Sequence, residues 1–93
     1  LTESELSILN QRLTLISDVI EDGVNPVVTI RYFVADRHKN GGAYVDIVAK
    51  VRRIDIAARQ VELFQKVGVS GSYMRIDMDM IHSISGELVD YIE

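Results

Sequence analysis

At residues 27–34, where the chain reads VVTIRYFV, its apolar periodicity changes from helical to extended. Val28, Ile30, Tyr32 and Val34 share one parity, and the residues between them take the other. This alternation is typical of a strand with one face on a core and one face in solvent. The segment therefore predicts the first strand of a sheet, with Val28, Ile30, Tyr32 and Val34 turned inward.

A hairpin and a long second strand are expected next. The polar loop 36–42 ends in Asn-Gly-Gly, which tolerates the positive φ of a tight turn. Residues 43–55 read as a strand whose inward positions are Val45, Ile47, Ala49 and Val51. Ile54 has the opposite parity to that set, so a bulge or bend near Arg52 and Arg53 is needed to keep Ile54 in the core.

The rest of the chain predicts three more short strands. Val61 and Leu63 alternate with Glu62, which indicates a third strand. Further strands are expected at 73–77 and 81–85, with a one-turn link at 78–80 between them. Leu88, Tyr91 and Ile92 in the tail fit a turn of helix or an edge strand.

A capped amphipathic helix precedes the strands. Thr2 and Glu5 have the spacing of a capping box, so a helix should begin there, and Gly23 followed by Pro26 should end it. An apolar stripe at spacings of three and four predicts a core-facing side made of Leu6, Leu9, Leu13, Ile16 and Ile20.

A second apolar stripe lies beside the first and consists of Ile8, Leu15 and Val19. The apolar arc is thus wider than one packing face needs. The second stripe is therefore a candidate surface for a protein partner or a second copy of the chain. Alternatively, it packs on upstream residues or on the C-terminal tail.

These elements predict a single domain, 1–93, of the mainly β (α+β) class. It should contain a helix at about 2–22, a five-stranded SH3-like or Sm-like small barrel at about 27–86, and a tail at 87–93. The composition, 47% apolar with one proline and six glycines, is that of a globular chain. Because the sequence starts at Leu1 rather than methionine, we expect residues upstream of it.

Composition also bears on location. The absence of cysteine excludes disulfide and thiolate-zinc frameworks and fits a reducing compartment, so a cytoplasmic location is expected. No apolar run reaches the length of a membrane helix, and no signal peptide is visible, so no membrane partner is expected.

Charge changes sign along the chain although the net charge is −4. Residues 1–26 sum to −4, residues 27–75 to +5 and residues 76–93 to −5. A basic middle between acidic ends fits a nucleic-acid footprint, and it fits equally a fold in which the ends neutralise the middle. Arg31, Lys50 and Arg52 have outward parity, so they form a candidate contact face for nucleic acid or for an acidic protein surface. Arg37 and Lys39, in the loop between the two strands, could join that face.

No constellation predicts catalysis, a metal or a cofactor. His38 lies in a polar loop and His82 in a predicted strand, and neither has a second ligand at metal-binding spacing. Asp77 and Asp79 are spaced as turn formers or caps rather than as paired catalytic carboxylates. We therefore expect a protein that is not an enzyme.

Three segments carry a family resemblance: VDIVAKVRRID at 45–55, VEL at 61–63 and MRIDMDMIHSI at 74–84. With the LTESE start at 1–5 and its following helix, they resemble the YolD-like family of bacteria. The loops 36–42 and 68–72 are longer than the family pattern. The resemblance implies a non-catalytic accessory partner of an error-prone Y-family DNA polymerase in DNA damage tolerance, with weak or no nucleic-acid binding.

The same pattern is also similar to Sm-like RNA-binding proteins, which share the plan of a helix followed by five strands. The positions where those proteins place RNA-binding residues read IAAR at 56–59 and SISG at 83–86, without the expected Asn and Arg-Gly signals. Sm-like RNA binding, or a generic oligomerising adaptor, is therefore the alternative function.

Overall fold

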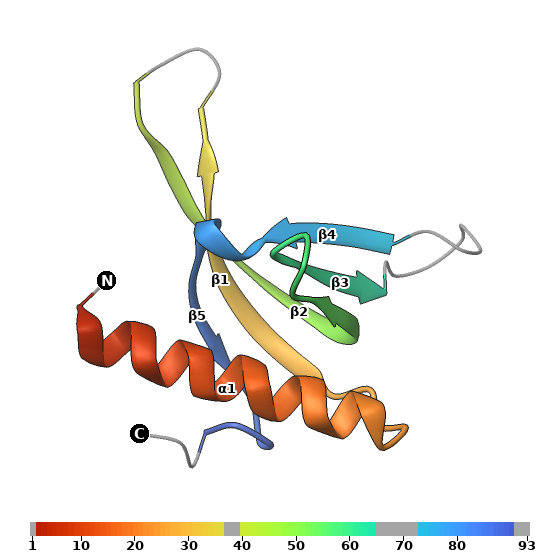
Figure 1. The fold of residues 1–93 in the computed structure, drawn as a ribbon. Coiled ribbons are helices and arrows are strands. Elements are labelled where there is room, and N and C mark those ends of the chain that lie inside the picture. Colours follow the sequence, from red (N-terminus) through yellow and green to blue (C-terminus); the bar gives the residue numbers. More distant parts are fainter. Residues whose placement is uncertain (1, 37–39, 65–72, 91–93) are drawn as a thin grey trace.

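The computed structural model describes residues 2–36, 40–64 and 73–90 as one helix and a five-stranded antiparallel sheet (Figure 1). The chain thus has the expected mainly β, α+β fold. Helix α1 spans Glu3–Glu21, and the strands are β1 (Val27–Ala35), β2 (Gly42–Asp55), β3 (Gln60–Phe64), β4 (Tyr73–Asp77) and β5 (Ile81–Ser85), with the 3-10 turn η1 (Met78–Met80) between the last two. Among the described residues, no helix combines the length and apolarity needed to cross a membrane.

Helix α1 begins at the predicted capping box. The amide of Glu5 donates to Oγ1 of Thr2 at 3.2 Å, and the amide of Thr2 donates back to the Glu5 carboxylate at 3.4 Å. Hydrogen bonds from the Thr2 side chain and backbone lower the pKa of Glu5. Gly23, with φ of 90°, follows the last turn, so the expected stop is confirmed.

The predicted core stripe of α1 is confirmed except at its first member. Leu9, Leu13 and Ile16 are buried, and Ile20 packs partly buried against the same core. Leu6 is 47% exposed, so its assignment to the core was wrong. The reason is that Leu6 lies with Glu3, Ser7 and Asn10 along the outer side of α1, whereas Leu9 faces the core.

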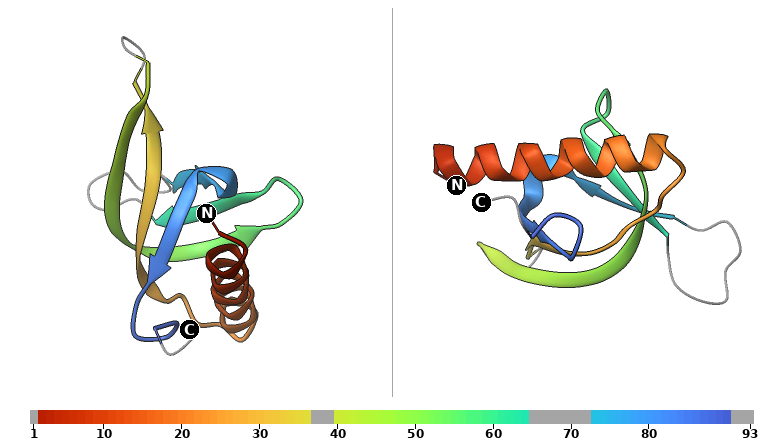
Figure 2. Two further views of the ribbon diagram at one scale, coloured as in Figure 1. Left: turned by 90° about the vertical axis from the view of Figure 1, so that its left-hand side faces the viewer. Right: turned by 90° about the horizontal axis from the view of Figure 1, so that it is seen from below.

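The sheet is open, with the strand order β4-β3-β2-β1-β5. Strand β2 belongs to both halves of the sheet, because residues 42–50 pair with β1 and residues 51–55 pair with β3. The strand curves between these partners, so the halves face different directions (Figure 2). The closure expected of a small barrel is not confirmed, because β4 and β5 remain the two outer strands of this order.

The bulge predicted in β2 is confirmed. The β2–β3 register shifts between Val51 and Arg53, which inserts one extra residue and lets the strand bend. Val51 is fully buried, and Ile54 packs partly buried against the same core although the two residues are three apart. The bulge therefore lets both Val51 and Ile54 face the core, and it also bends the sheet.

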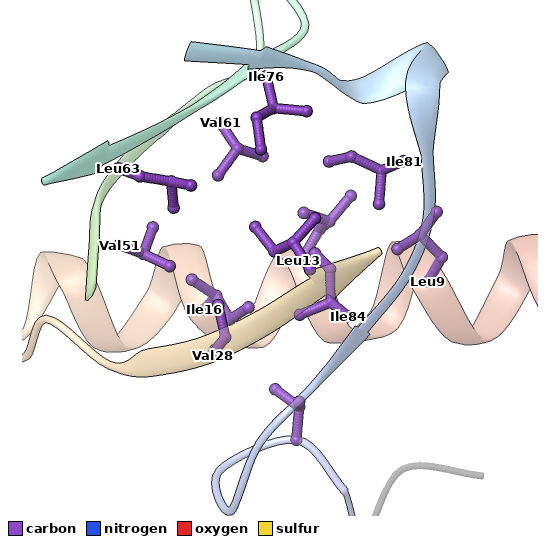
Figure 3. Close-up of a cluster of buried hydrophobic side chains, with 12 residues drawn as sticks. Leu9, Leu13, Ile16, Val28, Val51, Val61, Leu63, Ile76, Ile81 and Ile84 are labelled. Atoms are coloured by element: carbon purple, nitrogen blue, oxygen red, sulfur yellow. The ribbon is translucent and has the colours of Figure 1, made fainter. Parts of the chain in front are cut away.

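The core lies between α1 and the inner faces of the two half-sheets (Figure 3). Every element except η1 contributes to it, and the turn after β5 adds Val89, while Tyr91 and Ile92 of the tail lie outside the described residues. Full burial of one such aliphatic side chain contributes about 1.5–3 kcal/mol. The buried members are Leu9, Leu13, Ile16, Val28, Ile30, Val51, Val61, Leu63, Ile76, Ile81, Ile84 and Val89.

The outer end of the β1–β2 hairpin projects from this body (Figure 1). Val34 and Val45 were expected to face the core, but both are exposed, because none of the described elements covers that end of the hairpin. Tyr32, closer to the body, is half-buried. The expected positive φ in the loop is found at Gly41, at 102°.

Candidate functional site

The predicted basic residues do not form one unpaired basic face. Arg31 makes a bidentate pair with Asp46, directly opposite it in register, with Nε–Oδ1 at 2.8 Å and Nη2–Oδ2 at 3.2 Å. This hydrogen bond raises the pKa of Arg31 and lowers that of Asp46. Arg52 lies beyond the start of the bulge and pairs with Glu62 on β3. Arg31 and Arg52 are therefore largely neutralised by neighbours.

Lys50 is placed differently from the other two. It is exposed on β2, opposite Val27, and none of the ion pairs between described residues involves it. Arg37 and Lys39, expected to extend the basic face, lie outside the described residues, as does His38.

Glu62 is a buried carboxylate held by arginines from both neighbouring strands. Its Oε2 lies 2.6 Å from Nη1 of Arg52 and 3.2 Å from Nε of Arg53, and its Oε1 lies 3.1 Å from Nε of Arg75. The hydrogen bond from Arg75, followed by that from Arg52, lowers the pKa of Glu62. Such partners are needed because a buried carboxylate without them is costly.

This cluster was not expected from the sequence. Alternation in β3 turns Glu62 to the face opposite Val61 and Leu63. The registers Glu62↔Arg75 and Arg53↔Glu62 bring the arginines over it. Asp77 lies on the same face of β4 as Arg75, so the three arginines are balanced by Glu62, by the Asp55 that pairs with Arg53, and by Asp77.

Aromatic side chains flank the cluster. The Arg52 guanidinium carbon lies 4.0 Å from the centroid of the Tyr73 ring, and Phe64 packs edge-on against Tyr73 with centroids 5.9 Å apart. Both rings remain more than one third exposed. Phe64 and Tyr73 are nine residues apart in the sequence and are direct register partners across β3 and β4.

A second aromatic group lies on the other half-sheet. Tyr44 packs against Phe33, its register partner, with centroids 5.6 Å apart, and against His82 at 5.1 Å. With Met80, these rings line a hollow of about 330 Å³ below the projecting hairpin. His82 thus packs against the ring of Tyr44.

An apolar groove of about 570 Å³ runs along β2 where the strand curves between its two partners. Val48 is 69% exposed and Val27 is also exposed, so large apolar side chains meet solvent there. Among the described residues of its lining, Lys50 is the charged one, and the others are Val27, Ile47, Val48, Ala49, Leu63, Phe64 and Met74.

The second stripe of α1 is half-buried rather than open. Ile8 lines a small hollow of about 120 Å³ between α1 and β5, and Leu15 packs against the main core. Val19 is also half-buried. The large apolar side chain of α1 that is exposed is Leu6, which belongs to the first stripe.

Within residues 2–36, 40–64 and 73–90, no three His, Asp or Glu side chains are grouped so that they could hold a metal ion. Asp77 caps η1 by accepting from the amide of Asp79 at 3.1 Å, as the spacing of the two acids predicted. Asp79 in turn pairs with Arg59 at 2.8 Å.

Comparisons of the chain with models of known families, with curated proteins and with solved structures found no match.

Proposed function

We propose that this chain is a non-catalytic protein-interaction module. The observation that carries the proposal is a set of three large apolar side chains that are exposed on the outward face of the β1–β2 hairpin, on either side of the Arg31–Asp46 pair. Val27, Tyr44 and Val48 have the same outward parity in the β1–β2 register, and each is more than half exposed. Large exposed apolar side chains gathered on one face are typical of protein contact sites.

The proposed partner is an error-prone Y-family DNA polymerase, for which the chain acts as an accessory subunit in DNA damage tolerance. The support for this choice is the resemblance of segments 45–55, 61–63 and 74–84 to the YolD-like family. Residues 45–48, at the start of the first segment, belong to the exposed β1–β2 hairpin. The resemblance therefore includes part of the proposed contact surface.

Co-expression of the tagged chain with the Y-family polymerase of its source organism tests the proposal. We expect the polymerase to be captured by the wild type and lost with the double change Tyr44→Ser and Val48→Glu. Thr14→Glu, on the exposed face of α1, is the matched control and should retain capture. Capture that is absent with the wild type, or equal in all three proteins, contradicts the proposal.

RNA binding is the second candidate function, and the Arg52–Tyr73–Phe64 group favours it. Arginine next to exposed aromatic rings is a common arrangement in single-strand binding. Fluorescence anisotropy with single- and double-stranded RNA and DNA across a salt series separates the two functions. Tight, salt-resistant binding to one RNA sequence would favour the Sm-like alternative, whereas the proposed function predicts little binding at physiological salt.

A further inference from the structure

Over residues 42–50, one edge of β2 has none of the described strands beside it. Those residues pair with β1 on one side, and pairing with β3 on the other side begins only at Val51. None of the described strands covers the opposite edge of 42–50. An uncovered edge exposes unpaired backbone donors and acceptors to which another strand can add.

The hydrogen-bond pattern identifies which backbone groups face outward. The amide of Val51 donates to the carbonyl of Pro26 at 2.8 Å, so Val51 points toward the β1 side. In an antiparallel ladder, successive residues turn their N–H and C=O to alternate edges. Ile47 and Ala49 therefore face β1, whereas Val48 and Lys50 direct their backbone groups to the open edge.

The apolar groove lies along this same edge. Val48 and Lys50 line it together with Phe64 and Met74 from the other half-sheet. An extended segment placed there would form main-chain hydrogen bonds with β2 and bury its alternate side chains against these walls. This combination is the basis of recognition by strand addition.

The other edges of the sheet are less suited to this role. The Ile84 carbonyl, at the outer edge of β5, already accepts a hydrogen bond from Arg12 of α1. The five residues of β4 include the charged Arg75 and Asp77, and neither residue lines the groove. Only at β2 do an open edge and an apolar groove coincide among the described strands.

Charge indicates the chemistry of the occupant. Lys50 lies in the groove and takes part in none of the ion pairs between described residues. An incoming strand with carboxylates would complement this positive charge. A nucleic acid would leave both the apolar walls and the backbone edge of β2 without partners.

We propose that residues 44–50 of β2 bind an extended segment of a partner protein, in which apolar residues alternate with acidic ones, as an added strand. This inference rests on the proposed function, since it specifies how the protein partner is held.

The test uses the 93-residue chain and a nine-residue peptide of alternating glutamate and valine. We expect binding with a Kd below about 1 mM, measured by anisotropy of the labelled peptide. Amide hydrogen exchange followed by NMR should show that Val48 and Lys50 become protected on binding, whereas Ile47 and Ala49 are protected both before and after. A peptide with lysine in place of glutamate should bind at least tenfold more weakly.

Two variants at one position separate the backbone from the side chain. Val48→Pro removes an amide at the open edge and should weaken peptide binding at least tenfold, while the thermal unfolding midpoint stays close to that of the wild type. Val48→Thr keeps the amide and the β-branched shape and should bind the peptide within about threefold of the wild type. Ala49→Pro removes an amide that faces β1 and should lower the unfolding midpoint, which checks the assignment of the two edges.

Several results would overturn the inference: no peptide binding, no protection of Val48 and Lys50, equal binding of the lysine peptide, or protection of these amides by self-association without peptide. Capture of the polymerase that survives Val48→Pro would keep the proposed function and place the contact elsewhere. Peptide binding without any polymerase capture would keep the strand-addition site and reject the proposed partner.

Discussion

Nη1 of Arg52 lies 2.6 Å from Oε2 of Glu62, which joins the bulged part of β2 to the middle of β3. The Glu62 side chain is 5% exposed and that of Arg52 is 36% exposed, so the carboxylate is the buried partner. The bulge that returns Ile54 to the core also brings Arg52 and Arg53 to the same carboxylate. The curvature of the sheet and the ion pairs of Glu62 with Arg52 and Arg53 therefore both depend on the β2 bulge.

Replacement of this carboxylate should weaken the fold. Glu62→Gln leaves the arginines without their counter-ion, so we expect the free energy of unfolding at pH 7 to fall by about 1–3 kcal/mol in urea titrations. Asp46→Asn removes the partner of Arg31 in an exposed pair and should change it by less than about 1 kcal/mol. Equal losses in the two variants would contradict the role of burial.

The same variant should alter the response to acid. The pKa of Glu62 is lower in the folded chain than its ordinary value of 4.5. Its stabilising contribution is therefore complete above that value and is lost as the pH falls through the folded pKa. Between about pH 5 and about pH 3, the wild type should lose stability more steeply than Glu62→Gln. Parallel curves from chemical unfolding at each pH would reject this linkage.

The two ends of the first helical stripe should respond differently to truncation. Leu13→Ala removes a core side chain and should cost about 2–5 kcal/mol. Leu6→Ala, at an exposed position of the same helix, should stay within about 0.5 kcal/mol of the wild type. Thermal unfolding followed by circular dichroism measures both, and an unchanged midpoint for Leu13→Ala would reject its placement in the core.

The bulge can be tested with two isoleucines. Ile54→Asp places a carboxylate against the core and should destabilise the chain by about 2 kcal/mol or more. Ile56 is 71% exposed, so Ile56→Asp should be nearly neutral. If the two variants unfold at the same denaturant concentration, Ile54 does not face the core.

The second stripe of α1 should behave as part of the packing. Ile8→Ser, Leu15→Ser and Val19→Ser each remove half-buried apolar area, so we expect losses of about 1–2 kcal/mol each. A partner surface predicts the opposite result, in which stability is retained and only association is lost. Chemical unfolding combined with sedimentation velocity distinguishes these outcomes.

Local features of this chain were predictable because they depend on residues a few positions apart. The Thr2–Glu5 capping box, the stripe of Leu9, Leu13 and Ile16, and the need for a bulge before Ile54 all follow from short-range spacing and from the periods of helix and strand. The interpretation of Asp77 as a turn cap is of the same kind. Each of these features is present in the structure.

Features that depend on how distant elements pack against one another could not be predicted from such spacing. Leu6, Val34 and Val45 fit the apolar pattern, yet all three are exposed. Leu6 lies on the outer side of α1, and the end of the β1–β2 hairpin extends past the described elements that would bury Val34 and Val45. Glu62 is buried because cross-strand register sets Arg53 and Arg75 beside it. The open edge at Val48 arises because β2 changes its partner from β1 to β3 as it curves. Burial and open edges are properties of distant segments meeting in space, and the periodicity of one segment does not specify the segment that will face it.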